Sequence, residues 1–156
     1  MNRPEYPETE RGTHEAVVIQ PVGFEQLDVI RVLNFTIFEE ERVINTFDRE
    51  NLLMLMAFVD SEAVGFKIGY KQNEETFYSA KGGVLATHRR KGIARLMLDD
   101  MIARVKADGF TKFAFDTFPN KHPGMTILGL EEGFTVVKAD FNTVFHDYRL
   151  QFEKEI

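Results

Sequence analysis

The chain has 156 residues, a formal net charge of −6 at pH 7 and no cysteine. A nucleic-acid-binding protein normally carries a basic face, so the acidic balance argues against that role. The absence of cysteine excludes disulfides, a thiol nucleophile and Cys-ligated metal, and it fits the cytoplasm, where we expect the protein to reside. The length suits one domain with a sizeable core.

The hydrophobic pattern predicts a polar N-terminal segment followed by alternating strands and helices. We expect residues 1–14 to form a flexible tail and residues 15–156 to form one domain. The longest apolar run, residues 52–59, is too short to cross a bilayer, so no membrane association is expected. Apolar spacing and alternation predict, in chain order, a strand at 16–19, one or two helices over 26–43, strands at 53–59, 63–70 and 76–85, a helix over 92–106, a strand at 112–117, a helix over 123–132 and two final strands.

This order predicts a mixed α/β (α+β) fold, with a central mixed sheet of about seven strands flanked by about four helices. Pro21 and Gly23 are expected to end the first strand. Gly82 and Gly83, near the end of the strand at 76–85, indicate a bulge or a close approach of the backbone.

A basic segment, residues 88–91, lies between the strand that ends near Val84 and the helix that begins near Gly92. A strand-to-helix turn with glycine at the helix start presents unpaired backbone N–H groups, and the helix dipole adds about half a positive charge there. The side chains of residues 89–91 add three more cations. We interpret the segment as a pyrophosphate site. Its spacing is that of neither a P-loop nor a dinucleotide fingerprint, and a solvated basic helix start is the alternative.

The stretch from residue 83 to residue 98 resembles the acetyl-CoA signature of the GNAT superfamily of N-acetyltransferases, and residues 77–84 resemble a bacterial subgroup of unassigned substrate. Arg89, Gly92 and Ala94 match the signature, whereas Ala86 stands where the family often has Pro. The order of elements after residue 14 also matches the family fold. The resemblance implies acetyl-CoA as co-substrate and no metal. It places acetyl-CoA against Val84, Leu85, Arg89, Arg90, Lys91, Gly92, Ile93, Ala94 and Asn120.

A second family motif is similar to residues 120–134, where Asn120 is followed by a short helix and by Gly133 and Phe134. Many members place a Tyr five residues before the closing Phe, where its hydroxyl can protonate the leaving thiolate. Here that position is Gly129, so the usual general acid is absent. A free thiol has a pKa of about 8.5, so thiolate is a tolerable leaving group without that acid.

The resemblance implies direct acetyl transfer from the thioester to an amine. A backbone N–H near Val84 or Leu85 could stabilise the charge that develops on the thioester oxygen. An amine is mostly protonated at pH 7, so a base should help. The candidate bases are Glu39, Glu40, Glu41, Tyr70, Tyr78 and Asp116. We select Glu40 and Tyr78, together with Val84, as catalytic. The alternatives are a solvated helix end for the glutamates and a half-buried strand aromatic for Tyr78.

Other classes of protein also fit these residues. One is a non-catalytic acyl-CoA-binding sensor or regulatory module, and another is a small α/β interaction domain in which the basic turn is incidental. The acceptor could be a small-molecule or a peptide amine. Phe141, Phe145 and Tyr148 could form a homodimer contact, although we slightly favour a place in the core. The histidines have no metal-ligand spacing, which predicts surface or hydrogen-bonding roles for His14, His88, His122 and His146.

Overall fold

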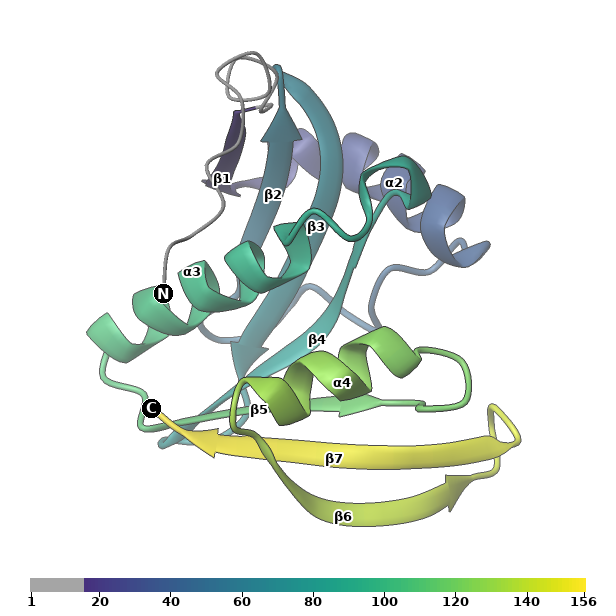
Figure 1. The fold of residues 1–156 in the computed structure, drawn as a ribbon. Coiled ribbons are helices and arrows are strands. Elements are labelled where there is room, and N and C mark those ends of the chain that lie inside the picture. Colours follow the sequence, from purple (N-terminus) through teal and green to yellow (C-terminus); the bar gives the residue numbers. More distant parts are fainter. Residues whose placement is uncertain (1–15) are drawn as a thin grey trace, which may run out of the picture.

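Three α-helices and seven strands make up the part of the chain that the computed structural model describes, residues 16–156 (Figure 1). The predicted flexible tail and His14 lie outside these residues. The strands are β1 (Val17–Val22), β2 (Leu53–Val59), β3 (Glu62–Lys71), β4 (Thr76–Val84), β5 (Lys112–Thr117), β6 (Thr135–Asn142) and β7 (Asp147–Glu155). The helices are α2 (Leu27–Phe38), α3 (Ile93–Ala107) and α4 (Pro123–Glu131), with short 3₁₀ turns η1 (Phe24–Gln26) and η2 (Ala86–His88).

All seven strands form one sheet in the order β1-β2-β3-β4-β5-β7-β6. Only β4 and β5 pair in parallel, and α3 is the helix that connects them. The other pairs are antiparallel. The predicted mixed sheet of seven strands is therefore confirmed, with three α-helices in the described part of the chain.

The two faces of the sheet carry separate helical layers. On one face, Ile30 and Leu33 of α2 pack against Phe66 and Ile68 of β3. On the other face, α3 and α4 cover a second set of buried side chains. This second set includes four phenylalanines that are at most 3% exposed, Phe77, Phe113, Phe115 and Phe152. Successive side chains of a strand point to opposite faces, so each strand contributes to both layers.

The first helix is shorter than the apolar spacing predicts, because it ends at Phe38 instead of near residue 43. Glu39 adopts a left-handed conformation with φ of 56°, which stops the helix. The fully buried Asn34 holds the chain beyond this point, since its amide nitrogen donates to the carbonyl oxygens of Glu40 (2.7 Å) and Arg42 (3.3 Å). The loop that follows α2 is thus pinned against the helix.

The first strand is longer than predicted and continues through Pro21 to Val22. Pro21 pairs in register with Leu55 of β2. The prediction that Pro21 would end the strand is wrong because β1 lies at the edge of the sheet, where a missing N–H breaks no ladder on the open side.

Candidate functional site

An opening in the sheet between β4 and β5 is the main irregularity of the fold. The last pair between these strands joins Ser79 to Phe115, although β4 continues to Val84. The departure coincides with a bulge, because Ile68 of β3 pairs with Lys81 whereas the next residue, Gly69, pairs with Ser79. The extra residue on β4 bends the strand away from β5. The second half of β4 therefore has one edge without a neighbouring strand in the described part of the chain.

The backbone of this edge turns specific polar groups into the opening. Successive residues of an antiparallel strand point their N–H and C=O groups to opposite sides. The N–H of Leu85 donates to the carbonyl oxygen of Val64 on the β3 side, at 2.8 Å. Because of this alternation, the backbone N–H and C=O of Gly83 also point toward β3. The backbone N–H and C=O groups of Gly82 and Val84 point into the opening. The sequence predicts Val84 as a site residue but does not predict Gly82 as one, because the role of Gly82 depends on this register.

The segment that joins β4 to α3 closes one end of the opening. Gly92 precedes the helix in a left-handed conformation with φ of 77°, which glycine adopts without strain. Within residues 16–156 no side chain caps the first turn of α3, so its N–H groups face outward. The Nε of Arg89 donates to the carbonyl oxygen of Val84 at 3.2 Å, which ties the segment to the strand end.

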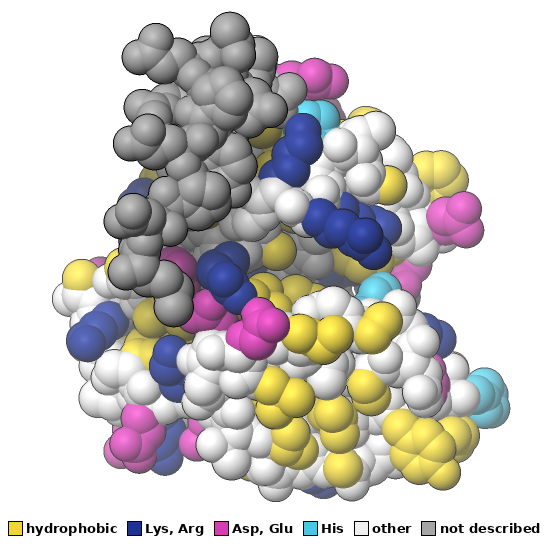
Figure 2. Space-filling view, in the orientation of Figure 1, with side chains coloured by type: hydrophobic (Ala, Val, Ile, Leu, Met, Phe, Trp, Pro, Cys, Tyr) yellow, Lys and Arg dark blue, Asp and Glu magenta, His cyan; other side chains and the backbone are white. Residues whose placement is uncertain are grey.

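The cationic side chains of this segment lie at the surface. Arg89, Arg90 and Lys91 are all exposed. Figure 2 shows Lys and Arg side chains gathered over this part of the surface, beside a hollow between the α3 and α4 sides of the molecule. Cationic side chains and helix N–H groups thus converge where a doubly charged phosphate group would be stabilised.

The opposite face of the sheet carries a tyrosine–carboxylate pair beside the opening. The hydroxyl of Tyr78 on β4 donates to Oδ2 of Asp116 on β5, at 2.9 Å. Partial burial raises the pKa of Asp116, although the hydrogen bond from Tyr78 and the charge of Arg149 oppose the rise. Burial, followed by the negative charge of Asp116, strongly raises the pKa of Tyr78. Tyr78 therefore keeps its proton at neutral pH, and Asp116 accepts the hydrogen bond.

Glu40 and His122 flank the same face. A carboxylate oxygen of Glu40 lies 2.6 Å from Nζ of Lys81, which holds the acid over β4. The ring of His122, just before α4, packs edge-on against Phe38 at the end of α2, with centroids 5.8 Å apart. Partial burial lowers the pKa of His122, Glu40 opposes this effect, and cations including Arg89 add to it. His122 is therefore mostly neutral at pH 7, so it can accept a proton.

Two positions of the second motif have structural partners. The side-chain amide of Asn120 donates to Oδ1 of Asp147 at 3.0 Å, which fixes the loop after β5 against the start of β7. Gly129 is buried on α4, and a Cβ added there would lie 2.8 Å from Cζ of Phe115. The space that a larger residue would need is thus occupied by an aromatic ring of β5.

The late aromatic residues do not belong to the core. Phe141, Phe145 and Tyr148 are 50%, 51% and 61% exposed, respectively. The preference for a core position is wrong because Phe141 and Tyr148 lie where β6 ends and β7 begins, and Phe145 lies in the turn between these strands. A contact between two copies of the chain stays a prediction.

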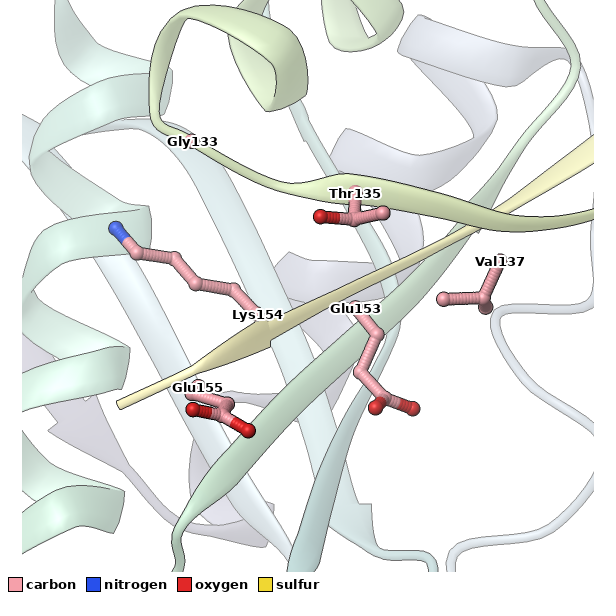
Figure 3. Close-up of a pocket in the computed structure, with 6 residues that line it drawn as sticks. All are labelled: Gly133, Thr135, Val137, Glu153, Lys154 and Glu155. Carbon is pink, nitrogen blue, oxygen red and sulfur yellow. The ribbon is translucent and has the colours of Figure 1, made fainter.

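A shallow pocket of about 330 Å³ lies away from the opening, between the start of β6 and the end of β7 (Figure 3). Thr135 and Val137 line it together with Glu153 and Lys154. Figure 3 shows Lys154 and Glu153 pointing in different directions from β7, so their charges do not converge on one ligand atom. Lys154 is also engaged, since it donates to the carbonyl oxygen of Glu132 at 2.7 Å. This pocket has no arrangement for catalysis.

Among residues 16–156 no group of three or more His, Cys, Asp or Glu side chains is placed to hold a metal ion. No helix of this part is long and apolar enough to cross a bilayer.

Comparison with known proteins places this architecture in a family. The model of the acetyltransferase (GNAT) family matches residues 24–125, and the chain belongs to that family. A comparison with curated proteins finds no match.

Several solved structures share the fold. An IAA acetyltransferase from Bacillus cereus is similar with a TM-score of 0.79 and 19% identity, over 90% of this chain and 100% of that one. The ribosomal-protein-S18-alanine N-acetyltransferase from Escherichia coli has a TM-score of 0.78 and 13% identity, over 90% and 94% of the two chains. A GNAT family acetyltransferase from Elizabethkingia anophelis with acetyl-CoA bound has a TM-score of 0.65 and 16% identity, over 90% and 98%.

Proposed function

We propose that this acetyltransferase moves an acetyl group from acetyl-CoA to an amine by direct transfer. The observation that carries the proposal is the unpaired edge of β4, which leads to the uncapped, cationic start of α3. The pantetheine arm of CoA contains amide groups that can pair with such an edge as an additional strand does. The pyrophosphate at its far end needs the cations and N–H groups found at the helix start.

The donor-binding residues follow from this arrangement. Arg89, Arg90, Lys91, Gly92, Ile93 and Ala94 hold the pyrophosphate, while Val84 and Leu85 line the path of the pantetheine arm, and Asn120 holds the loop opposite. The buried hydroxyl of Thr117 on β5 has no hydrogen-bond partner among the described residues. A polar group of the pantetheine arm would satisfy it. The N–H groups of Gly82 and Val84 are positioned to stabilise the thioester oxygen as it gains charge.

The amine reaches the thioester from the face that carries Glu40 and Asp116. Their negative charges attract a protonated amine, and a neutral His122 or the carboxylate of Glu40 accepts its proton. Tyr78 orients Asp116 through its hydrogen bond. The name of the similar Escherichia coli enzyme specifies an alanine of a ribosomal protein as acceptor. That name favours a peptide or protein amine over a small molecule as the first acceptor to test.

Substitution of Gly92 tests the donor site. The Gly92→Asp variant places a carboxylate beside the pyrophosphate, and the Gly92→Asn variant has nearly the same shape without the charge. Asn also tolerates the left-handed conformation. We expect calorimetry to show acetyl-CoA binding at least about tenfold weaker for Gly92→Asp than for Gly92→Asn. Equal affinities of the two variants would contradict the assignment of this loop.

The acceptor is identified by measuring CoA release with peptide, amino-acid and small-molecule amines. CoA release that depends on the amine supports a transferase. In the Gly92→Asp variant, CoA release should be slower than in the wild type because acetyl-CoA binds more weakly. Acetyl-CoA binding without release for any class would instead support a binding module without catalysis.

A further inference from the structure

Among the residues that the structure describes, one lysine is buried, and it lies under the α3 layer next to the opening. Lys67 lies in the middle of β3, is only 5% exposed, and pairs with Leu55 of β2 on one side and with Gly82 of β4 on the other. Gly82 is one of the two residues that turn their backbone groups into the opening. Lys67 and Gly82 share a face of the sheet, the face that α3 and α4 cover.

The side chain of Lys67 leans over β4 because Gly82 leaves room for it. A Cβ added at Gly82 would lie 3.2 Å from Cγ of Lys67, so any larger residue there would press on the lysine stem. The register also makes this a non-hydrogen-bonded pair, in which the side chains of an antiparallel ladder come closest.

The lysine residue is buried, and its ammonium group has no protein partner among the described residues. Among residues 16–156, neither a hydrogen bond nor an ion pair is formed by Nζ of Lys67. Burial alone lowers the pKa of Lys67 from 10.5 to about 8. Near pH 8, Lys67 is therefore a neutral amine in a large fraction of the molecules. The neutral amine is the nucleophilic form.

We propose that Lys67 is a self-acylation site, which takes the acetyl group of bound acetyl-CoA when no acceptor amine is present. The inference rests on the proposed function, because the thioester must lie along the edge that contains Gly82. The lone pair of Nζ attacks the thioester carbonyl carbon, a C–N bond forms and the C–S bond breaks. Sulfur leaves as thiolate, the nitrogen loses its proton to water, and the products are an N-acetylated lysine and CoA.

The experiment incubates the full-length protein with acetyl-CoA at pH 7.5 and follows its intact mass, followed by peptide mapping. We expect one acetyl group per chain, located on Lys67. The neutral fraction alone makes a lysine with a pKa of about 8 on the order of 100-fold more reactive at pH 7.5 than a lysine with the reference pKa. Lys106, at an exposed position of α3, is the site used for comparison. Gly92→Asp should abolish the modification and Gly92→Asn should retain it. The Lys67→Met variant should gain no acetyl group.

Each outcome separates this inference from the proposed function. If calorimetry shows acetyl-CoA binding and Lys67 stays unmodified, self-acylation is wrong and the donor site stands. If acetyl-CoA does not bind, both fail together. Lys67 could be modified in the Gly92→Asp variant at the same rate as in the wild type, or no faster than Lys106 is modified. Either result would reveal chemical acetylation from solution and would overturn the proposal.

Discussion

Replacing Lys67 by Met should stabilise the protein at neutral pH, because the substitution removes a buried charge and keeps a side chain of similar length. Burial lowers the pKa of Lys67 from 10.5 to about 8. A difference of this size corresponds to about 3 kcal/mol between the charged and neutral forms. Below pH 8 the lysine is charged in both the folded and the unfolded chain, so the folded state carries the full penalty there.

The sign of the pH dependence follows from the same pKa. Between about pH 8 and 10.5 the unfolded chain binds a proton that the folded chain has released, so the stability of the wild type rises with pH. Above this window the penalty is gone. The Lys67→Met variant lacks the titrating group and should therefore lose its advantage as the pH rises.

Urea unfolding at pH 7 and at pH 10.5 measures this difference. We expect Lys67→Met to be more stable than the wild type by about 2–3 kcal/mol at pH 7, after allowance for imperfect packing, and nearly equal at pH 10.5. Lys106→Met, at an exposed position of α3, is the matched control and should stay within about 0.5 kcal/mol at both values. A variant that is less stable at pH 7, or whose advantage does not change with pH, would refute the reasoning.

Two further predictions concern the closely packed helix and the tyrosine–carboxylate pair. Gly129→Ala should destabilise the protein by about 1–3 kcal/mol in urea unfolding, because the new Cβ meets Phe115. Gly124→Ala on the same helix meets no atom within 4 Å and should be neutral or slightly stabilising, and equal effects at both positions would contradict the packing argument. Tyr78→Phe should cost about 1 kcal/mol and raise the pKa of Asp116 further, because the carboxylate loses a donor. Carboxyl NMR titration checks this, and an unchanged Asp116 pKa would refute it.

The fold was largely predictable because most elements carry a regular apolar spacing. The helix over residues 93–107 and the strand over 112–117 appear where alternation or helical periodicity placed them. The misplaced ends have local causes that spacing does not contain. Asn34 anchors two carbonyl groups of the following loop, and Pro21 lies on an edge strand. Both effects depend on tertiary position.

The candidate site was predictable only where it is contiguous in sequence. Residues 89–94 follow one another in a turn, so their charges and the glycine could be seen together. Lys67 and Gly82 meet through the register of two strands, and a single bulge near Ser79 decides which residues face each other. His122, just before α4, comes close to Phe38, at the end of α2, although the two helices cover opposite faces of the sheet. No spacing in the sequence reports such contacts.

The opening between β4 and β5 also divides the sheet into two parts. Among the described residues, the strand pairing that joins β1 to β4 with β5, β7 and β6 is limited to the parallel pairs of residues 76–79 with residues 112–115 (Figure 1). We expect this narrow junction in the strand pairing to let each part exchange its amide hydrogens as a separate cooperative unit. A ligand that lies in the opening contacts both parts and merges the two units. Slower hydrogen exchange in β5 and β7 on ligand binding would therefore report occupancy of the opening, even for a ligand that is never turned over.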